Sequence, residues 1–357
     1  MSDEKPELDW GKVKKFSAQV SNDIGAAMLG AMSYIGDRLG IFKSLAQAGS
    51  VTSAELAEKT GLSERYLREW LAAMTAAQYV VYDPAAKHYS MPPENAMILA
   101  NDESPFFMGG FIQGIIANLS VTPKVLEAFK TGAGVRQSEY PAETFESMER
   151  SSAAMYRHQL VRKWLPTMPQ VVKALEEGGS SLDVGCGSGR GCIALAQAFP
   201  KAKIFGYDAH QGSLDRARNN AKAAGVADRI TFEVVDCTRL PAGQFDFIST
   251  FDVVHDSIDP VGLLRSIRGA LKPDGTYLML EVNVSPRLEN NINAMGRMMY
   301  SMSTLYCMSV SLGGGGAGIG ACMGEDKARE LAREAGFSEF RRLPIDDLFS
   351  VLYELKA

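Results

Sequence analysis

The spacing of apolar and polar positions divides the chain into a mainly helical first part and a later part in which strands and helices alternate. Between residues 10 and 48, apolar residues recur at steps of three and four, which predicts helix. These residues are Val20, Ile24, Met28, Ala31, Ile35 and Leu39. Three glycines interrupt this pattern and lower its helix propensity, so we expect them to allow close approach of another helix, such as one from a second copy of the chain. They are Gly25, Gly30 and Gly36.

The next segment, residues 51–90, has the pattern of a winged helix-turn-helix. Thr52 and Glu55 stand at capping-box spacing, Gly61 predicts a turn, and a second helix is expected near Ser63, followed by a hairpin. The segment carries four basic and five acidic residues, whereas a DNA-reading module is expected to be basic. We therefore interpret it as a structural and dimerising module, with DNA binding as the alternative.

Residues 119–178 read as mostly helical, and from Ser181 onward strand-length apolar runs alternate with amphipathic helices. The runs are "SLDVG", "AKIFGYD", "RITFEVVD", "FDFISTFDVV" and "TYLMLEV", and the helices are expected at 190–199, 212–224, 260–271 and 325–335, with two more strands in the tail. This alternation predicts an α/β fold with a parallel sheet covered by helices on both faces. Ligands of such sheets bind at the carboxyl ends of the strands.

Composition excludes several classes of protein. With 37 basic and 42 acidic residues the formal net charge is −5, which offers no electrostatic footprint for a polyanion. The five cysteines show no CxxC pair, so neither a disulfide framework nor a metal site is signalled, and a reducing cytoplasm fits them. The chain starts with acidic residues rather than the basic and apolar regions of a signal peptide. Two uncharged stretches, 104–123 and 298–324, contain too many polar residues and glycines for a membrane span.

The loop after the first α/β strand carries glycines at alternate positions, Gly185, Gly187 and Gly189. A dinucleotide fingerprint would need a glycine where Arg190 stands, and no Lys-Ser/Thr pair follows as in a P-loop. Glycines here let the backbone approach a ligand at the start of a helix, and Asp208, after the next strand, can accept both hydrogens of a ribose diol. A further acid at the end of the following strand could accept from an adenine amino group; this is Asp236.

Four stretches, "LDVGCGSGRG", "GYD", "VVDC" and "ALKPDG", stand in the order found in class I S-adenosylmethionine-dependent methyltransferases, and the sequence resembles that family. The resemblance implies a Rossmann-like sheet, with S-adenosylmethionine as cofactor. It implies that the glycine loop lies under the methionine part, that Asp208 holds the ribose, that Asp236 and Cys237 frame the adenine, and that Phe251 and Asp252 line the pocket. The full set of candidate cofactor-binding residues is Asp183, Gly185, Cys186, Gly187, Gly189, Asp208, Ala209, Asp236, Cys237, Phe251 and Asp252.

The resemblance extends over nearly the whole chain. The stretches "SYIGDRLGIFKSLA", "SPFFMGGFIQ", "MER" and "FDVVHDSIDP" are similar to bacterial, notably mycobacterial, methyltransferases with an N-terminal winged-helix domain. The architecture also resembles plant-type small-molecule O-methyltransferases, in which the winged segment serves dimerisation and closes the partner's active site. We therefore expect a homodimer formed through an N-terminal helical and winged-helix domain, 1–100, a helical connection and cap, 101–160, and a methyltransferase domain, 161–357, with a substrate-covering insertion at 284–324.

Methyl transfer from a sulfonium is an in-line displacement, so the protein must position the nucleophile, exclude water and remove a proton where the nucleophile carries one. His255 is the candidate base, because it follows the fourth strand at the carboxyl edge and an imidazole has an ordinary pKa of about 6.5. In plant-type O-methyltransferases a similar "HD" pair carries the catalytic histidine, so Asp256 joins the candidates. Here Ser257 replaces the tryptophan that usually follows. The alternative is that His255 only packs near the cofactor.

The insertion is rich in methionine, tyrosine and cysteine: Met295, Met298, Met299, Tyr300, Met302, Tyr306, Cys307, Met308, Cys322 and Met323. Such a surface suits an apolar or soft, sulfur-containing substrate, although a methionine-rich packed helix at a dimer interface is the other interpretation. The glycine run 313–320 is expected to be a mobile flap.

Together these observations predict a cytoplasmic homodimeric methyltransferase acting on an O, S or N atom of a small, mainly apolar molecule, with a thiol or phenol preferred. The sequence lacks both the Asn/Asp-Pro-Pro-aromatic stretch of amino-methylating DNA enzymes and the Pro-Cys of cytosine-C5 enzymes. Nucleic acid and membrane are therefore not expected as partners. The alternative function is a ligand-sensing regulator that binds DNA through its winged-helix domain.

Overall fold

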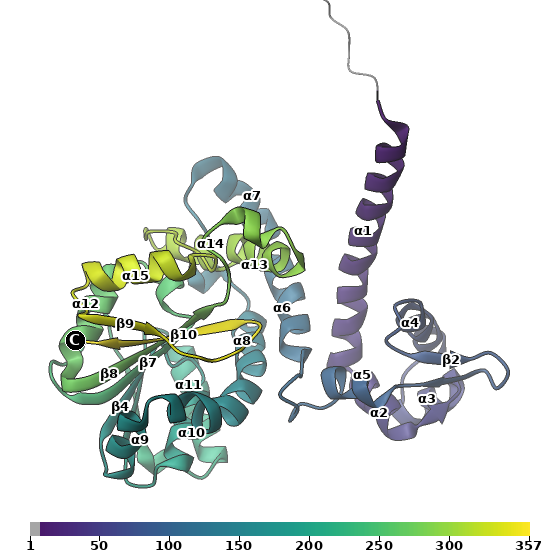
Figure 1. Ribbon diagram of the computed structural model, residues 1–357. Coiled ribbons are helices and arrows are strands. Elements are labelled where there is room, and N and C mark those ends of the chain that lie inside the picture. Colours follow the sequence, from purple (N-terminus) through teal and green to yellow (C-terminus); the bar gives the residue numbers. More distant parts are fainter. Residues whose placement is uncertain (1–7) are drawn as a thin grey trace, which may run out of the picture. The chain divides into compact units, whose positions relative to one another are not determined.

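The computed structural model describes residues 8–357 (Figure 1). The chain groups into two compact units that divide after Ile116, and each is described by itself. The division into segments at residues 100 and 160 stays a prediction.

The first unit begins with two helices where the sequence predicts one. Helix α1 spans Trp10–Arg38 and α2 spans Ile41–Ala48, separated by a turn in which Gly40 has a φ of +66°. Helix α1 runs without a break through all three of its internal glycines. At Gly36 a Cβ atom would lie 2.5 Å from the ring of Trp70, so this glycine lets a side chain of the same chain pack against the α1 backbone.

The winged segment follows the predicted order. Its elements are β1 (Ser50–Val51), α3 (Ser53–Thr60), α4 (Glu64–Ala76), β2 (Val81–Asp83) and β3 (His88–Ser90), followed by α5 (Pro93–Leu99). The capping box is present: Thr52 caps Glu55 of α3, and the Glu55 side chain accepts from the Thr52 backbone in return. Gly61 ends α3 in the left-handed conformation, and the three strands pair antiparallel in the order β1-β3-β2.

The second unit opens with helices that lead to the sheet. Helix α6 (Gly109–Ser120) crosses the division between the units, and the elements that follow are α7 (Thr122–Thr131), η1 (Gln137–Glu139), α8 (Ala142–Met155), η2 (Tyr156–Trp164), η3 (Leu165–Thr167) and α9 (Pro169–Glu176). The η2 segment is a π-helix, a form that is rare and often lies at functional sites.

A seven-stranded sheet forms the centre of this unit (Figure 1). Its strands are β4 (Ser180–Val184), β5 (Lys203–Asp208), β6 (Ile230–Val234), β7 (Phe245–Phe251), β8 (Leu271–Val282), β9 (Glu339–Arg342) and β10 (Ser350–Lys356), in the order β6-β5-β4-β7-β8-β10-β9. Strands β4 to β8 are parallel, as predicted, whereas β10 lies antiparallel between β8 and β9.

Helices cover both faces of the sheet because each presents an apolar stripe to it. They are α10 (Arg190–Ala198), α11 (Gln211–Ala223), α12 (Pro260–Ala270) and α15 (Gly324–Glu334), together with α9. Leu195 of α10 and Leu214 of α11 are fully buried in one cluster, and Leu264 of α12 and Leu331 of α15 are buried in the other. The predicted fold class is confirmed: a helical winged-helix region comes first in the chain, and a Rossmann-like sheet flanked by helices follows it.

The insertion between β8 and α15 forms η6 (Leu288–Asn291), α13 (Ala294–Leu305) and α14 (Cys307–Gly313) and then a glycine-rich turn. This turn packs closely on its neighbours. A Cβ at Gly316 would lie 2.4 Å from the backbone of Ile258, and one at Gly313 would lie 2.4 Å from the backbone of Val135. The Ala317 N–H also donates to the carbonyl of Ile258 at 3.1 Å. The mobility of the glycine run stays a prediction.

No helix within residues 8–357 combines the length and apolar character that crossing a bilayer requires. The cytoplasmic location stays a prediction.

Candidate active site

The glycine loop joins β4 to α10 at the carboxyl edge of the sheet. Gly185, Gly187 and Gly189 have φ angles of +70°, +53° and +73°, in the left-handed region that favours glycine. A Cβ at Gly185 would lie 2.7 Å from Val253, and one at Gly189 would lie 2.7 Å from Phe232, whereas nothing lies within 4 Å of the Cβ position at Gly187. The outer two glycines therefore permit packing, and Gly187 leaves open space beside the loop.

Asp208 ends β5 next to this loop. Its Oδ2 atom accepts from the Gly187 N–H at 2.9 Å and its Oδ1 atom accepts from the His210 N–H at 2.8 Å. Burial raises the pKa of Asp208, and these two hydrogen bonds oppose the rise. The carboxylate therefore ties the glycine loop to the start of α11 and retains lone pairs for a diol.

Asp183 is buried more deeply and is the residue before the last one of β4. Ser249 donates to its Oδ1 at 3.0 Å, and the Cys192 thiol lies 3.8 Å from its Oδ2. Complete burial raises the pKa of Asp183 to about 7; the Ser249 hydrogen bond opposes this and the charge of Asp208 adds to it. A Cβ at Gly191 would lie 3.0 Å from Asp183 Oδ2, so the start of α10 lies directly over this acid.

The candidate adenine-side residues follow β5 and β6 and are more exposed. Ala209 is exposed, and Asp236 accepts from the Thr238 N–H at 3.0 Å and from its hydroxyl at 2.7 Å, which lowers the pKa of Asp236. Cys186 and Cys237 are buried and half-buried, and burial raises the pKa of Cys237 to about 12. These two thiols are therefore protonated packing groups near neutral pH.

Phe251 and Asp252 lie at the end of β7. The Phe251 ring meets Tyr156 edge-on, with ring centroids 4.9 Å apart, so the π-helix supplies an aromatic wall beside this strand. Asp252 has a φ of +56°, an uncommon conformation for a non-glycine residue and one that concentrates at functional sites. Asp252 is exposed and lies directly after the last residue of the strand.

His255 lies on the short helix η5 (Val254–Asp256) and is 2% exposed. Its Nδ1 atom is hydrogen bonded to the carboxylate of Glu281, which is also buried, and its Nε2 atom lies 3.1 Å from Asp256 Oδ1. Burial alone would lower the pKa of His255, but the carboxylates of Glu281 and Asp256 outweigh it and hold that pKa above the usual range. The ordinary imidazole pKa used in the sequence argument therefore does not apply here.

Sequence reasoning did not single out Glu281, the partner of His255. The sequence contains one sign of this partner, since Glu281 is an acid inside the apolar run "TYLMLEV". A charged residue in a buried strand must be paired with another polar group. It also gave no role to Glu149 of α8, which accepts from Arg190 at 2.7 Å and from Asn220 at 2.8 Å. Glu149 thus connects α8 to α10, which follows the glycine loop, and to α11.

The described residues fit an adenosyl cofactor. The open space at Gly187 leaves room beside the loop, Asp208 presents a carboxylate on the adjoining strand, and Phe251 and Tyr156 provide an apolar wall. The structure brings the predicted residues of β4, β5, β6 and β7 to one edge of the sheet. Their contacts with a cofactor stay a prediction.

Comparison with known proteins agrees with this arrangement. Residues 175–336 match the methyltransferase domain family, and residues 27–101 match the Rv2258c-like winged HTH domain family. The human N-acetylserotonin methyltransferase, solved in complex with SAM, aligns over 100% of both chains with a TM-score of 0.67 at 18% identity. The mitomycin 7-O-methyltransferase aligns over 97% of this chain and 100% of its own, with a TM-score of 0.69 at 20% identity.

Curated relatives match only part of this chain. A ubiquinone biosynthesis O-methyltransferase of Ruegeria pomeroyi is 30% identical over 106 residues, which is 30% of this chain and 42% of that protein. The 27-O-demethylrifamycin SV methyltransferase of Amycolatopsis mediterranei is 31% identical over 103 residues, 28% of this chain and 38% of its own length. The chain thus spans less than half of the length of these relatives.

The fold is that of the class I methyltransferases, and the methyltransferase domain at residues 175–336 implies S-adenosylmethionine as the cofactor. The chain carries a methyltransferase domain and an N-terminal winged helix-turn-helix domain of the Rv2258c-like kind, so the resemblance stated from the sequence is confirmed.

Proposed function

We propose that the protein transfers the methyl group of S-adenosylmethionine to an oxygen or sulfur atom of a small, mainly apolar molecule, with His255 as the base. The observation that carries this proposal is the buried pair of His255 and Glu281 at the carboxyl edge of the sheet. Val253, two residues before His255, lies against Gly185 of the glycine loop. The segment that carries the candidate base therefore packs directly on the proposed cofactor loop.

When bound, the cofactor supplies a methyl group on a positively charged sulfur. The glycine loop would lie along its methionine part, and Asp208 would accept hydrogen bonds from the ribose hydroxyls. Asp236 and Cys237 would frame the adenine, and Phe251 and Asp252 would line the pocket. Two features support this placement: the left-handed conformation of the three loop glycines, and the hydrogen bonds that the Asp208 carboxylate accepts from the Gly187 and His210 N–H groups. Both preorganise the site before the ligand binds.

His255 in its neutral form accepts the acceptor's proton at Nε2, because Nδ1 is held by Glu281. The raised pKa of His255 means that this neutral form becomes more populated as the pH rises. Asp256 occupies the vicinity of Nε2 and must yield that position to the acceptor. Once the proton has moved, the Glu281 carboxylate stabilises the imidazolium that forms. Glu281 therefore orients the His255 ring, and movement of Asp256 makes Nε2 accessible to the acceptor.

We propose that the acceptor lies against an apolar and aromatic wall. Tyr140 and Tyr306 meet edge-on with centroids 4.9 Å apart and pack in a buried cluster with Val135 and Ala321. No charged residue occurs between Met298 and Gly324. A phenol suits such a wall because its ring is apolar. A thiol acceptor also suits it, and methylation of a thiol would depend less on His255 because a thiolate is a soft nucleophile that can react without a protein base.

The winged segment supports assembly in preference to DNA recognition. On α4 the exposed Arg65 pairs with Glu69, and Arg68 lies 3.4 Å from Glu64, so its cations are matched by acids of the same helix. Helix α1 exposes large apolar side chains at helical spacing: Trp10 (67%), Phe16 (65%), Ile24 (57%) and Met28 (66%). We propose that these belong to a homodimer interface.

The decisive experiment measures transfer of labelled methyl from S-adenosylmethionine to a panel of phenols, thiols, carboxylic acids and amines. We expect turnover of phenols or thiols, and His255→Ala should slow methylation of a phenol by about a hundredfold or more while sparing cofactor binding. If His255→Ala and the wild type methylated every acceptor at equal rates, His255 would be a packing residue. If tight cofactor binding occurred without any turnover, and DNA binding fell steeply with salt, the regulator function would replace this proposal.

A further inference from the structure

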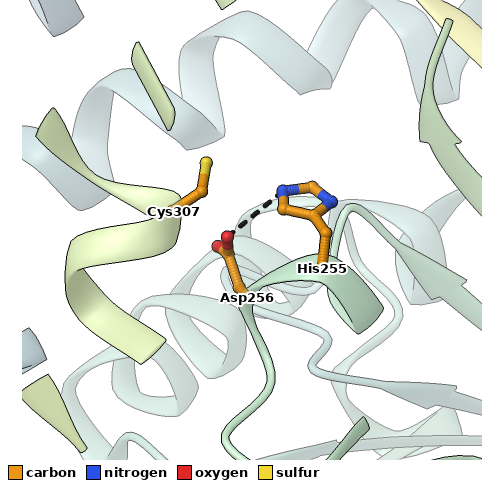
Figure 2. A group of neighbouring side chains, drawn as sticks. All are labelled: His255, Asp256 and Cys307. Atoms are coloured by element: carbon orange, nitrogen blue, oxygen red, sulfur yellow. Dashed lines mark ion pairs between the residues drawn. The ribbon is translucent and has the colours of Figure 1, made fainter. Parts of the chain in front are cut away.

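Three potential metal ligands of different chemistry meet beside the proposed base. Figure 2 shows His255 and Asp256 on η5 facing Cys307, the first residue of α14. One ligand atom from each residue lies within 4.8 Å of the other two. An imidazole nitrogen, a carboxylate oxygen and a sulfur together form a donor set that suits Zn²⁺ rather than Mg²⁺ or Ca²⁺.

A second observation concerns Glu281, which lies behind the imidazole ring. Its Oε2 atom accepts from Nδ1 of His255, which leaves Nε2 directed toward the other two residues. A carboxylate on the far nitrogen is the arrangement that fixes the tautomer and orientation of zinc-binding histidines. The other oxygen of Glu281, Oε1, is buried and has no hydrogen-bond partner among the described residues, so His255 is the group that balances this carboxylate.

We propose that His255 Nε2, the Asp256 carboxylate and the Cys307 thiolate bind one Zn²⁺ ion. Tetrahedral coordination at 2.0–2.3 Å would require the ligand atoms to draw together by about 1 Å, which rotation of the Asp256 and Cys307 side chains can provide. Three protein ligands leave a fourth position for water. Binding converts the Cys307 thiol to a thiolate and requires a free lone pair at His255 Nε2, so the thiol proton and the proton of a protonated Nε2 are both released to solvent.

The ion has a functional consequence, which rests on the proposed function. Nε2 is both the proposed proton acceptor and the proposed ligand, and its lone pair cannot serve both. Bound zinc therefore blocks the base, so methylation of a phenol falls as the site fills and recovers when the ion is removed. The binding site itself does not depend on this consequence.

The test uses the full-length protein, freed of metal by chelation and titrated with Zn²⁺. We expect one zinc per chain after desalting, and Co²⁺ in place of Zn²⁺ should give the near-ultraviolet charge-transfer absorption of a cobalt–thiolate bond. Cys307→Ala should weaken Zn²⁺ binding at least about tenfold and abolish the cobalt band. Cys322→Ala is the matched control, because this half-buried cysteine belongs to the same insertion but not to the cluster. Asp256→Asn keeps the side-chain shape and provides a second variant if Cys307→Ala does not fold.

The outcomes separate the two proposals. Zinc and cobalt signals that persist in both Cys307→Ala and Asp256→Asn would overturn the site. Stoichiometric zinc that leaves phenol methylation unchanged, or raises it, would overturn the blocking consequence. A metal-free protein that binds S-adenosylmethionine but methylates no acceptor would contradict the proposed function, whatever the zinc titration gives.

Discussion

Glu281 on β8 is hydrogen bonded to Nδ1 of His255 on η5, and both side chains are almost completely buried. Glu281 lies near the end of β8, and η5 follows the end of the neighbouring parallel strand β7, so the pairing of these two strands brings the residues together. One ring nitrogen is thereby fixed, and all further chemistry of this histidine involves the other.

The Glu281→Gln variant tests this pairing. Glutamine retains the shape and a hydrogen-bond acceptor but removes the charge that stabilises the imidazolium. We expect kcat for a phenol to fall about 10- to 100-fold, part of the effect that a general base supplies, with the Kd for S-adenosylmethionine unchanged. Steady-state kinetics and calorimetry would measure the two quantities. An unaltered kcat would mean that the pair serves only packing.

Asp208→Ala should weaken binding of S-adenosylmethionine, because the ribose diol would lose its acceptor and Gly187 its hydrogen-bond partner. A charge-assisted hydrogen bond contributes about 1.5–3 kcal/mol, so we expect Kd to rise by at least about tenfold. Titration calorimetry would measure the change. Asp236→Ala serves as the comparison, because Asp236 is an exposed carboxylate. A larger rise in Kd for Asp236→Ala than for Asp208→Ala would contradict our assignment of Asp208 to the ribose and Asp236 to the adenine.

Gly187→Ala should affect the ligand more than the fold. Its φ of +53° disfavours alanine by about 1–2 kcal/mol, but no atom lies within 4 Å of the added methyl group. We expect a modest loss of stability in urea unfolding and a loss of cofactor affinity that exceeds it. Gly189→Ala provides the contrast, because its methyl group would meet Phe232 and should cost mainly stability. Cofactor affinity that survives in Gly187→Ala would place the ligand away from the loop.

Stability should depend on pH through Asp183. Its folded pKa of about 7 lies above its unfolded value of 3.8, so the folded state binds more protons between these values. Stability is therefore greatest below pH 4 as far as this group is concerned, and it falls by up to about 1.4 kcal/mol per pH unit as the pH rises toward 7. Asp183→Asn should remove this dependence and leave the protein more stable than wild type at pH 8.

Urea unfolding of wild type and Asp183→Asn at pH 5 and pH 8 would test this prediction. Carboxylates with lowered pKa values, such as Asp236 and Asp246, act in the opposite direction at lower pH, so the difference between the two proteins is the quantity of interest. A difference that does not change with pH would show that Asp183 is not the group responsible.

Much of the fold could be predicted from the sequence, because strand runs, helix periods and the glycine loop are local patterns. The capping box at Thr52 and the turn at Gly61 lie where the residue types require them. The break after α1 was missed, because the apolar period continues through Leu39 and Gly40 into α2. The π-helix η2 was also missed, since it differs from an α-helix only in hydrogen bonding.

The neighbours of His255 could not be predicted in the same way. Glu281 reaches the ring because β7 and β8 pair in a particular register, and Cys307 reaches it because the insertion folds back over η5. Neither relationship has a period or a fixed spacing in the chain. Sequence reasoning therefore placed His255 and Asp256 at the correct edge of the sheet without the two residues that define their chemistry.

The glycine-rich turn after α14 restricts how this protein can change its substrate. Gly313, the last residue of α14, and Gly316 of the turn pack directly on the backbone near Val135 and Ile258, with no room for a β-carbon. Any larger residue at either position would displace the insertion from η5, and with it the wall that contains Tyr306. New acceptor preferences are therefore expected to arise through side chains of that wall, while the turn itself stays the same length and composition.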